Sequence, residues 1–181
     1  ITNCSTSGQA LDTEEQLMLT LINQKRAAAG LPSLKASPNL SRAAAWKSGD
    51  SSATGASFSH TDSLGRSVPT RVSQCGYGMM SSAEDIAYGF GGAQGTLNAF
   101  LNSTMGHACP IDGSRPAGAP TCSPTMPRSF TVIGIGRVGS AWTLNFGSLD
   151  DSSQPWDSGS PASPTATNTA SNNSPSNTPT S

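Results

Sequence analysis

Apolar residues recur at helical spacing near the start of the chain. The apolar positions between Thr13 and Ala29 fall on one face of a helix, and Gly30 supplies a stop signal directly after them. Thr13 and Gln16 have the spacing of a capping box, in which each residue bonds the backbone of the other. The pattern therefore predicts a helix over residues 13–29 whose apolar stripe packs into a core.

Two further helices are predicted before residue 75. Ser37 is a suitable cap and Pro38 a suitable first helical residue, and small or apolar positions follow them. We expect this helix to fray over residues 47–49 and to give way to a polar loop over residues 50–57. A short helix is expected over residues 69–74.

Another helix with an apolar face is predicted over residues 97–106. Leu97 and Leu101 lie four residues apart and therefore share one helical face. Gly106 suits the left-handed conformation that ends many helices. The prediction places His107, one of only two histidines in the chain, directly after a rigid element.

Strand patterns dominate later in the chain. Residues 130–138 are rich in β-branched side chains and predict a strand, residues 139–140 a tight turn, and residues 141–147 an antiparallel return strand. A shorter strand is expected over residues 83–87, followed by a glycine-rich loop over residues 89–95. Helices together with a late hairpin predict an α+β fold, in which helices pack on a small antiparallel sheet.

The composition changes at residue 150. Residues 150–181 are almost entirely Ser, Thr, Pro, Asn and Gly, so they bury too little apolar surface to offset the entropy lost on ordering. We predict a disordered tail there, a stalk of the kind that carries O-linked sugars, and no structural part for the isolated Trp156. Residues 1–149 have the usual size of one domain.

Charge and hydropathy argue against a nucleic-acid partner and against a membrane-spanning helix. The net charge of the 181-residue chain is −1 and its pI is about 6.1, so no basic patch indicates a nucleic-acid partner. No apolar run approaches the roughly 20 residues that a membrane-spanning helix needs.

The four cysteines indicate a secreted, disulfide-bonded protein. None lies in a Cys-X-X-Cys pair, which argues against a zinc knuckle, and three pairings are possible. We favour Cys109–Cys122, because these two residues bracket one Gly/Pro-rich loop, and Cys4–Cys75, which then remain. Four sequons begin at Asn3, Asn39, Asn102 and Asn172 and fit a glycoprotein. The chain begins at Ile1, and we expect it to be the form left after removal of a signal peptide.

Six segments follow one another through the domain in a recognisable order. They are LINQKRAAAGLPSL, FSHTDSLGRSVPTRVSQCGY, AEDIAYG, FLNSTMGHA, FTVIGIGRV and AWTLNFG. In this order they resemble the CAP superfamily of cysteine-rich secretory proteins, antigen 5 and pathogenesis-related 1 proteins, and most closely its short bacterial and fungal members. The resemblance covers about residues 17–147 and implies an α-β-α sandwich with a cleft.

The resemblance also implies which residues line that cleft. Family members carry two histidines and usually two acidic residues there. The positions that match in this chain are His60, Glu84 and His107. The family's second acid usually follows the aromatic residue that corresponds to Phe100, but no acid follows Phe100 here. Asp62 and Asp85 are candidates to replace it, and the sequence places neither.

Two neutral imidazoles and one carboxylate form a plausible three-ligand metal site with water in the open position. This set of ligands would favour Zn²⁺ over Mg²⁺, and the resemblance implies only weak binding of a divalent metal. The alternative is structural: His60, Glu84 and His107 hydrogen-bond one another and brace the cleft. The sequence does not favour either of these two hypotheses over the other.

The resemblance further implies a sterol or fatty acid as a partner, held in an apolar groove beside the core; a fully packed core is the alternative. A hydrolase that uses a metal-bound water, or Ser59 or Ser103 as nucleophile, is a third hypothesis. It is less favoured because the chain has neither a Gly-X-Ser-X-Gly nor a His-Glu-X-X-His motif. We therefore predict a secreted, non-catalytic binding module, either free outside the cell or at the cell wall.

Overall fold

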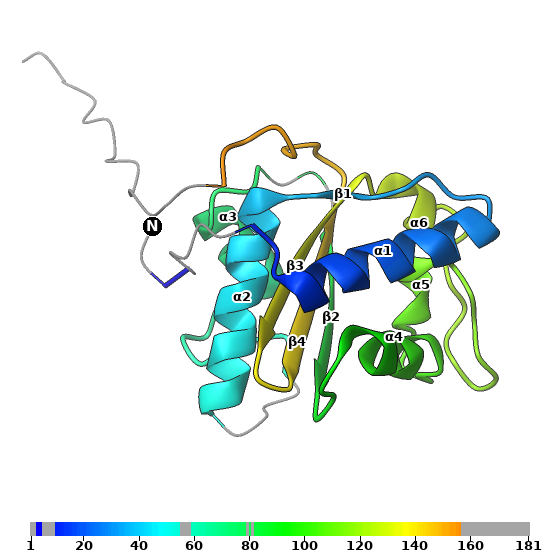
Figure 1. The fold of residues 1–181 in the computed structure, drawn as a ribbon, viewed down its shortest axis with the longest axis horizontal. Coiled ribbons are helices and arrows are strands. Elements are labelled where there is room, and N and C mark those ends of the chain that lie inside the picture. Colours follow the sequence, from blue (N-terminus) through cyan, green and yellow to red (C-terminus); the bar gives the residue numbers. More distant parts are fainter. Residues whose placement is uncertain (1–2, 5–9, 55–58, 79, 81, 157–181) are drawn as a thin grey trace, which may run out of the picture.

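The fold is a sheet covered by helices on both faces (Figure 1). The computed structural model describes residues 3–4, 10–54, 59–78, 80 and 82–156. The strands are β1 (Lys35–Ala36), β2 (Ser82–Tyr88), β3 (Val132–Val138) and β4 (Ala141–Gly147). The helices are α1 (Thr13–Ala28), α2 (Pro38–Ala53), α3 (Val68–Gln74), α4 (Ala93–Leu101), α5 (Ala108–Ile111) and α6 (Met126–Ser129). The predicted α+β class and α-β-α sandwich are confirmed.

The sheet is open, and its strand order is β1-β3-β4-β2. β4 pairs antiparallel with both β3 and β2, as the predicted hairpin requires. β1 pairs parallel with β3, with Lys35 opposite Val132, so the sheet is mixed rather than purely antiparallel. The sequence did not reveal β1, because a strand of two residues is too short to show an alternating pattern.

Helix α2 lies directly on the backbone of β3. A Cβ added at Gly134 would come within 2.1 Å of the Leu40 carbonyl carbon, and one at Gly136 within 2.1 Å of the Ala45 nitrogen. The two glycines therefore let the helix and the sheet approach each other closely.

Helix α2 continues to Ala53, so the predicted fraying over residues 47–49 and the loop from residue 50 are wrong. Its second half is polar but buried, and Ser48 Oγ donates to the Gly136 carbonyl at 2.8 Å. Small hydroxyl side chains can pack against a strand that carries glycines. A helix with such a buried polar face is not detected from the spacing of apolar residues. The part of the expected loop over residues 55–58 lies outside the described residues.

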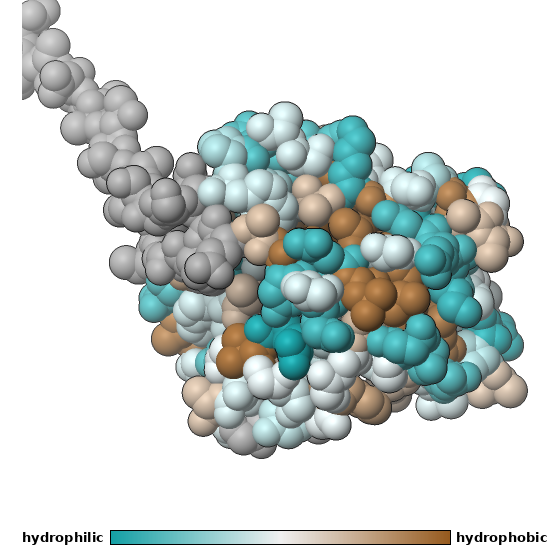
Figure 2. All heavy atoms as spheres, in the orientation of Figure 1, coloured by the Kyte–Doolittle hydropathy of each residue, from teal (hydrophilic) through white to brown (hydrophobic). Residues whose placement is uncertain are grey.

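Helix α1 begins where expected, but a different pair of residues caps it. The Glu15 backbone N–H donates to Asp12 Oδ1 at 2.8 Å, and the Asp12 N–H donates to Glu15 Oε2 at 2.9 Å. The capping box is therefore Asp12–Glu15 and not Thr13–Gln16, because two carboxylates one position earlier make the stronger acceptors. Leu17 remains 41% exposed on this helix. Figure 2 shows an apolar patch over the region of α1 and α4, surrounded by polar side chains.

Helix α4 is displaced from its prediction. It runs from Ala93 to Leu101 instead of over residues 97–106, so the expected loop over residues 89–95 ends early and Gly95 is helical. Asn102 ends the helix, because the polar residues after Leu101 form turns. Gly106 does take the predicted left-handed conformation, with φ of 92°, but it follows this turn and not the helix.

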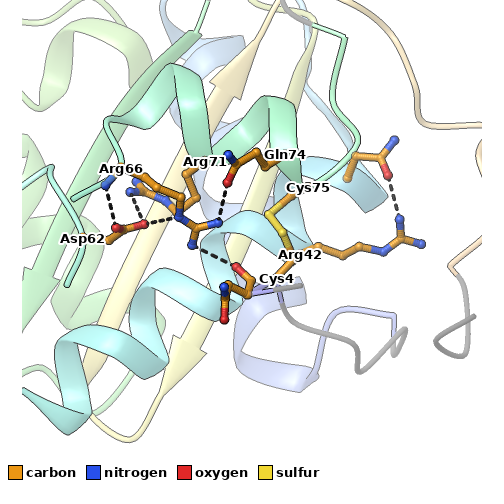
Figure 3. The surroundings of a disulfide bond; sticks show 9 residues. Cys4, Arg42, Asp62, Arg66, Arg71, Gln74 and Cys75 are labelled. Carbon is orange, nitrogen blue, oxygen red and sulfur yellow. Dashed lines mark hydrogen bonds and ion pairs between the residues drawn. A yellow bond between two sulfur atoms is a disulfide. The ribbon is translucent and has the colours of Figure 1, made fainter. Parts of the chain in front are cut away.

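Both predicted disulfides are present. Cys4–Cys75 joins the start of the chain to the end of α3 (Figure 3), and Cys109–Cys122 closes a loop onto α5. No helix in the described part of the chain is long and apolar enough to cross a membrane.

The described chain continues past residue 150 along the domain. Asp150 accepts a hydrogen bond from Lys35 Nζ at 2.6 Å, and Trp156 packs, partly buried, against the main apolar core. The expectation that Trp156 has no structural part is therefore wrong: an indole ring can bury a large apolar area even inside a polar segment. The remainder of the expected tail, residues 157–181, lies outside the described residues.

Candidate functional site

A pocket of about 540 Å³ opens beside β2, the edge strand of the sheet. All three site residues expected from the sequence, His60, Glu84 and His107, line it. A smaller hollow of about 230 Å³ shares His60 and Glu84 with this pocket. The sheet thus brings together two histidines that lie far apart in the sequence.

His60 is oriented by a buried carboxylate. Its Nδ1 lies 3.1 Å from Glu84 Oε1. Because a carboxylate accepts, Nδ1 carries the proton, and Nε2 has no protein partner among the described residues. The His60 side chain is 53% exposed and that of Glu84 only 1%, so a buried carboxylate orients a ring that is open to solvent.

Arg71 holds Glu84 from behind. The fully buried Arg71 donates from Nη2 to Glu84 Oε2 and from Nη1 to the His60 carbonyl at 3.2 Å. The buried Asn145 contributes as well, since its amide nitrogen donates to Glu84 Oε2 at 3.0 Å in the orientation that satisfies its neighbours. Sequence reasoning missed Arg71, although an arginine among the apolar residues of a short helix was an available signal.

A second ion pair supports Arg71 (Figure 3). Asp62 Oδ2 accepts from Arg66 Nε at 2.8 Å and lies 3.6 Å from Arg71 Nη1. Burial alone would raise the pKa of Asp62, but hydrogen bonds from Arg66 and the charge of Arg71 outweigh burial and lower it. Arg66 Nη2 also donates to the Asn3 carbonyl at 2.8 Å. Asp62 is thus a support behind the pocket and not the missing second acid.

His107 approaches the pocket from the other face of the sheet. It immediately precedes α5, and its ring meets Phe100 edge to face, with centroids 5.4 Å apart and planes at 77°. Burial lowers the pKa of His107, and the charge of His60 lowers it further. His107 is therefore neutral at physiological pH, which is the form that binds metals.

Asp85 is the candidate second acid that does border the pocket. It is only 3% exposed, and its Oδ2 has no hydrogen-bond partner among the described residues. Burial, aided by the neighbouring Glu84 charge, raises the pKa of Asp85 well above its ordinary value. The pocket therefore borders one carboxyl group that is held by Arg71 and one that is buried without a counter-charge.

The arrangement limits the chemistry. In the described part of the chain, no three His, Cys, Asp or Glu side chains form a ready-made metal cluster. Both oxygens of Glu84 already accept hydrogen bonds. Within the same residues neither imidazole is hydrogen-bonded to a serine, which a serine nucleophile would need.

Family comparison agrees with this architecture. The model of the CAP family, described as the cysteine-rich secretory protein family, matches residues 19–146. The chain therefore belongs to the CAP family, and the resemblance found in the sequence is confirmed. A comparison with curated proteins gave no match.

Three solved bacterial structures share the fold. An extracellular protein with an SCP domain from Bacillus anthracis superposes with a TM-score of 0.63 at 21% identity, over 78% of this chain and 45% of that one. An outer surface protein of Borrelia burgdorferi gives 0.62 at 19% identity, over 79% and 99%. A cysteine-rich secretory protein of Staphylococcus aureus gives 0.54 at 12% identity, over 75% and 38%. This chain thus spans less than half of the Bacillus and Staphylococcus proteins, and at these identities the likeness establishes the fold.

Proposed function

We propose that this protein is a non-catalytic extracellular binding module whose pocket weakly binds a divalent metal ion, preferably Zn²⁺, through His60 and His107. The observation that carries the proposal is that both imidazoles of the chain line the same pocket. Imidazole nitrogens suit Zn²⁺ better than Mg²⁺ or Ca²⁺, which prefer oxygen ligands.

The proposed site has two protein ligands, His60 and His107, and not the three expected from the sequence. Histidines that bind metals commonly donate their other ring N–H to a carboxylate, which fixes the ring and its tautomer. Glu84 stands in this relation to His60, and Arg71 neutralises Glu84. We therefore assign Glu84 to orienting His60. Two protein ligands leave the remaining positions to water or a partner, so the affinity is low.

An extracellular location is supported by the disulfides and by the relatives. Structural disulfides persist in oxidising compartments. The Bacillus relative is described as extracellular and the Borrelia relative as an outer surface protein. Association with the cell wall remains a prediction.

A sterol or fatty acid remains a second prediction for this pocket. Its volume falls in the range of small-molecule sites, roughly 300–1,000 Å³, and its lining includes the apolar residues Ile86, Met105 and Met126. Extraction of the purified protein with organic solvent, followed by mass spectrometry, tests this prediction. Empty extracts together with no binding of added sterol or fatty acid would contradict it. Hydrolysis is disfavoured because no nucleophile is paired with either imidazole in the described residues.

Isothermal titration with Zn²⁺ tests the metal proposal. Wild-type protein should bind one ion weakly at pH 7.5, and the His60→Ala/His107→Ala variant should not bind. Glu84→Gln should weaken binding about 10- to 100-fold, the usual effect of losing an orienting carboxylate. Tyr88→Ala, at the end of β2 beyond the pocket, is the matched control and should bind normally.

The pH dependence gives a separate check. Protons compete with the metal for imidazole nitrogen, so affinity should fall below about pH 6. Equal Zn²⁺ affinity in wild type and the double variant, or unchanged affinity down to pH 5, would overturn the proposal.

A further inference from the structure

The backbone of β2 has one side that the sheet does not use. In antiparallel pairs, residues alternate between those whose N–H and C=O bond the neighbouring strand and those whose groups point away. The Gly89 N–H donates to the Ser140 carbonyl at 3.1 Å, in line with the register that pairs Tyr88 with Ala141. Counting back by twos, residues 83, 85 and 87 bond β4, and the N–H and C=O groups of Glu84 and Ile86 point outward.

These outward groups lie beside the pocket. Glu84 and Ile86 both line it, and no other element in the described chain hydrogen-bonds their backbones. β2 is the last strand of the sheet on this side. An edge of this kind presents donors and acceptors in a row, which is a template for another strand.

The hollow has the shape of a groove along this edge. The larger pocket borders β2 from residue 83 to residue 86 and the smaller one from residue 82 to residue 84, so together they follow the strand. At about 3.4 Å per residue, five residues of strand span roughly 17 Å. The opposite wall carries Met105 and Met126, which are 76% and 36% exposed.

We propose that this groove binds an extended peptide segment of a partner protein, which adds as a strand along the outward backbone groups of Glu84 and Ile86 and places an apolar side chain between Ile86 and the two methionines. Main-chain hydrogen bonds to Glu84 and Ile86 supply affinity, and the apolar wall supplies selectivity. Thioether side chains adapt to apolar groups of different shape. The proposal shares the pocket of the proposed function and requires no metal ion.

The surroundings favour a single strand over a second copy of this chain. Met105, Pro110 and Met126 line the pocket together with β2, so this edge borders a hollow and not an open surface. A lone peptide fits a recess of this volume, whereas the edge of a second sheet would bring its covering helices against the same wall.

Synthetic peptides test the proposal directly. We would measure fluorescence anisotropy with labelled, acetylated peptides of the pattern Lys-Thr-Val-Thr-Xaa-Thr-Val-Thr-Lys, in EDTA and in Zn²⁺. Peptides with Leu, Ile or Met at Xaa should bind, and those with Asp at Xaa should not. Methylating the two peptide nitrogens that face β2 removes their N–H groups and should weaken binding about tenfold or more, because two hydrogen bonds are lost.

Protein variants locate the binding. Ile86→Pro deletes one outward N–H without breaking a bond to β4, and edge strands tolerate proline at such positions. It should weaken binding several-fold, because one hydrogen bond is lost, whereas Tyr88→Pro, whose N–H also points outward but lies beyond the groove, should leave binding unchanged. If Ile86→Pro does not fold, two other measurements test the same proposal. Met105→Asp on the exposed wall should weaken peptide binding, and the methylated peptide should bind wild-type protein more weakly than the unmodified one.

Three results would overturn the proposal: no binding by any peptide, equal binding of the methylated peptide, or binding lost in EDTA. A wild-type dimer that becomes monomeric in Ile86→Pro would also overturn it, since the edge would then be occupied by a second copy. Peptide binding in EDTA without Zn²⁺ affinity would sustain this inference and remove the metal proposal, so the two fail separately.

Discussion

The two faces of the sheet are built from different kinds of side chain. Beneath α1 and α4, the strands contribute large apolar residues, among them Ile133, Trp142 and Phe146, all at most 1% exposed. Beneath α2 and α3, a smaller apolar cluster that includes Leu40, Val72 and Val132 lies beside strand glycines, polar groups and fully buried charges such as Lys47 and Arg71. One face is mainly an apolar core, and the other combines apolar residues with buried charges.

The difference separates stability from positioning. Burying apolar area contributes free energy of folding without requiring one arrangement of partners. Buried ion pairs roughly repay their own desolvation, and they do so only with the partners in place. The chain of contacts Asp62–Arg71–Glu84–His60 lies on the charged face, and it fixes the histidine ring at the pocket. The larger apolar cluster stabilises the fold, and the buried ion pairs on the other face orient the site.

Among these variants, Arg71→Met should lower the free energy of unfolding most, because it removes a charge from the charged face. It leaves Glu84 buried without its counter-charge and should lower the free energy of unfolding by about 3–5 kcal/mol at pH 7. Urea unfolding measures the loss. Adding Glu84→Leu should restore a large part of it, because an apolar pair then replaces the ion pair. Strictly additive losses in the double variant would show that the charges do not act as a unit.

Gly136→Ala probes the close contact on the same face. The new Cβ would lie 2.1 Å from the Ala45 nitrogen, so α2 must move away from the sheet, at about 3 kcal/mol. Thermal unfolding should show a lower Tm. Gly91→Ala is the matched control, since a Cβ there meets nothing within 4 Å, and it should leave Tm nearly unchanged. Similar Tm values for both variants would contradict the close packing of α2.

Asp85→Asn should stabilise the protein at neutral pH by roughly 1–3 kcal/mol, the cost of one poorly satisfied buried group. Burial raises the folded-state pKa of Asp85 above its ordinary value of 3.8. Below pH 3.8 the acid is protonated in both states; as the pH rises, only the unfolded state ionises freely, so wild-type stability falls relative to the variant. Denaturant unfolding between pH 4 and pH 8 measures this difference. Parallel curves for the two proteins would contradict it.

Gly95→Ala should give the smallest effect and the opposite sign to Gly136→Ala. Gly95 lies exposed inside α4, and an added Cβ meets nothing within 4 Å. Alanine is favoured over glycine in a helix interior by about 1 kcal/mol, so the free energy of unfolding should rise by that amount. A decrease in urea unfolding would show that α4 does not extend over Gly95.

Apolar periodicity predicted the apolar face well. The stripe of α1 and the hairpin of β3 and β4 were predicted from the spacing of their side chains, since burial on one face leaves a direct trace in sequence. The same method failed for the second half of α2, whose buried face carries Ser48 and Lys47. It also failed for the ends of α4, because an apolar stripe does not mark where a helix begins and ends.

The site was predicted through the family resemblance and not through any local pattern. Family motifs marked His60, Glu84 and His107, and all three line one pocket. Arg71 was missed because its role depends on two carboxylates distant from it in sequence. The different fates of Asp62 and Asp85 could not be predicted either, since one meets arginines and the other meets none in the described structure.

The register between β2 and β4 decides which acid stands on which face. Glu84 lies opposite Asn145, on the side of α2, while Asp85 lies opposite Leu144, on the side of the apolar core. Because successive side chains of a strand alternate, a slip of one residue would exchange the two carboxyls. Asp85 would then face Arg71. Glu84, which orients His60, would lie in the apolar layer. The seven-residue alignment of these two strands is therefore what keeps neighbouring acids in opposite environments, one beside Arg71 and one in the apolar layer.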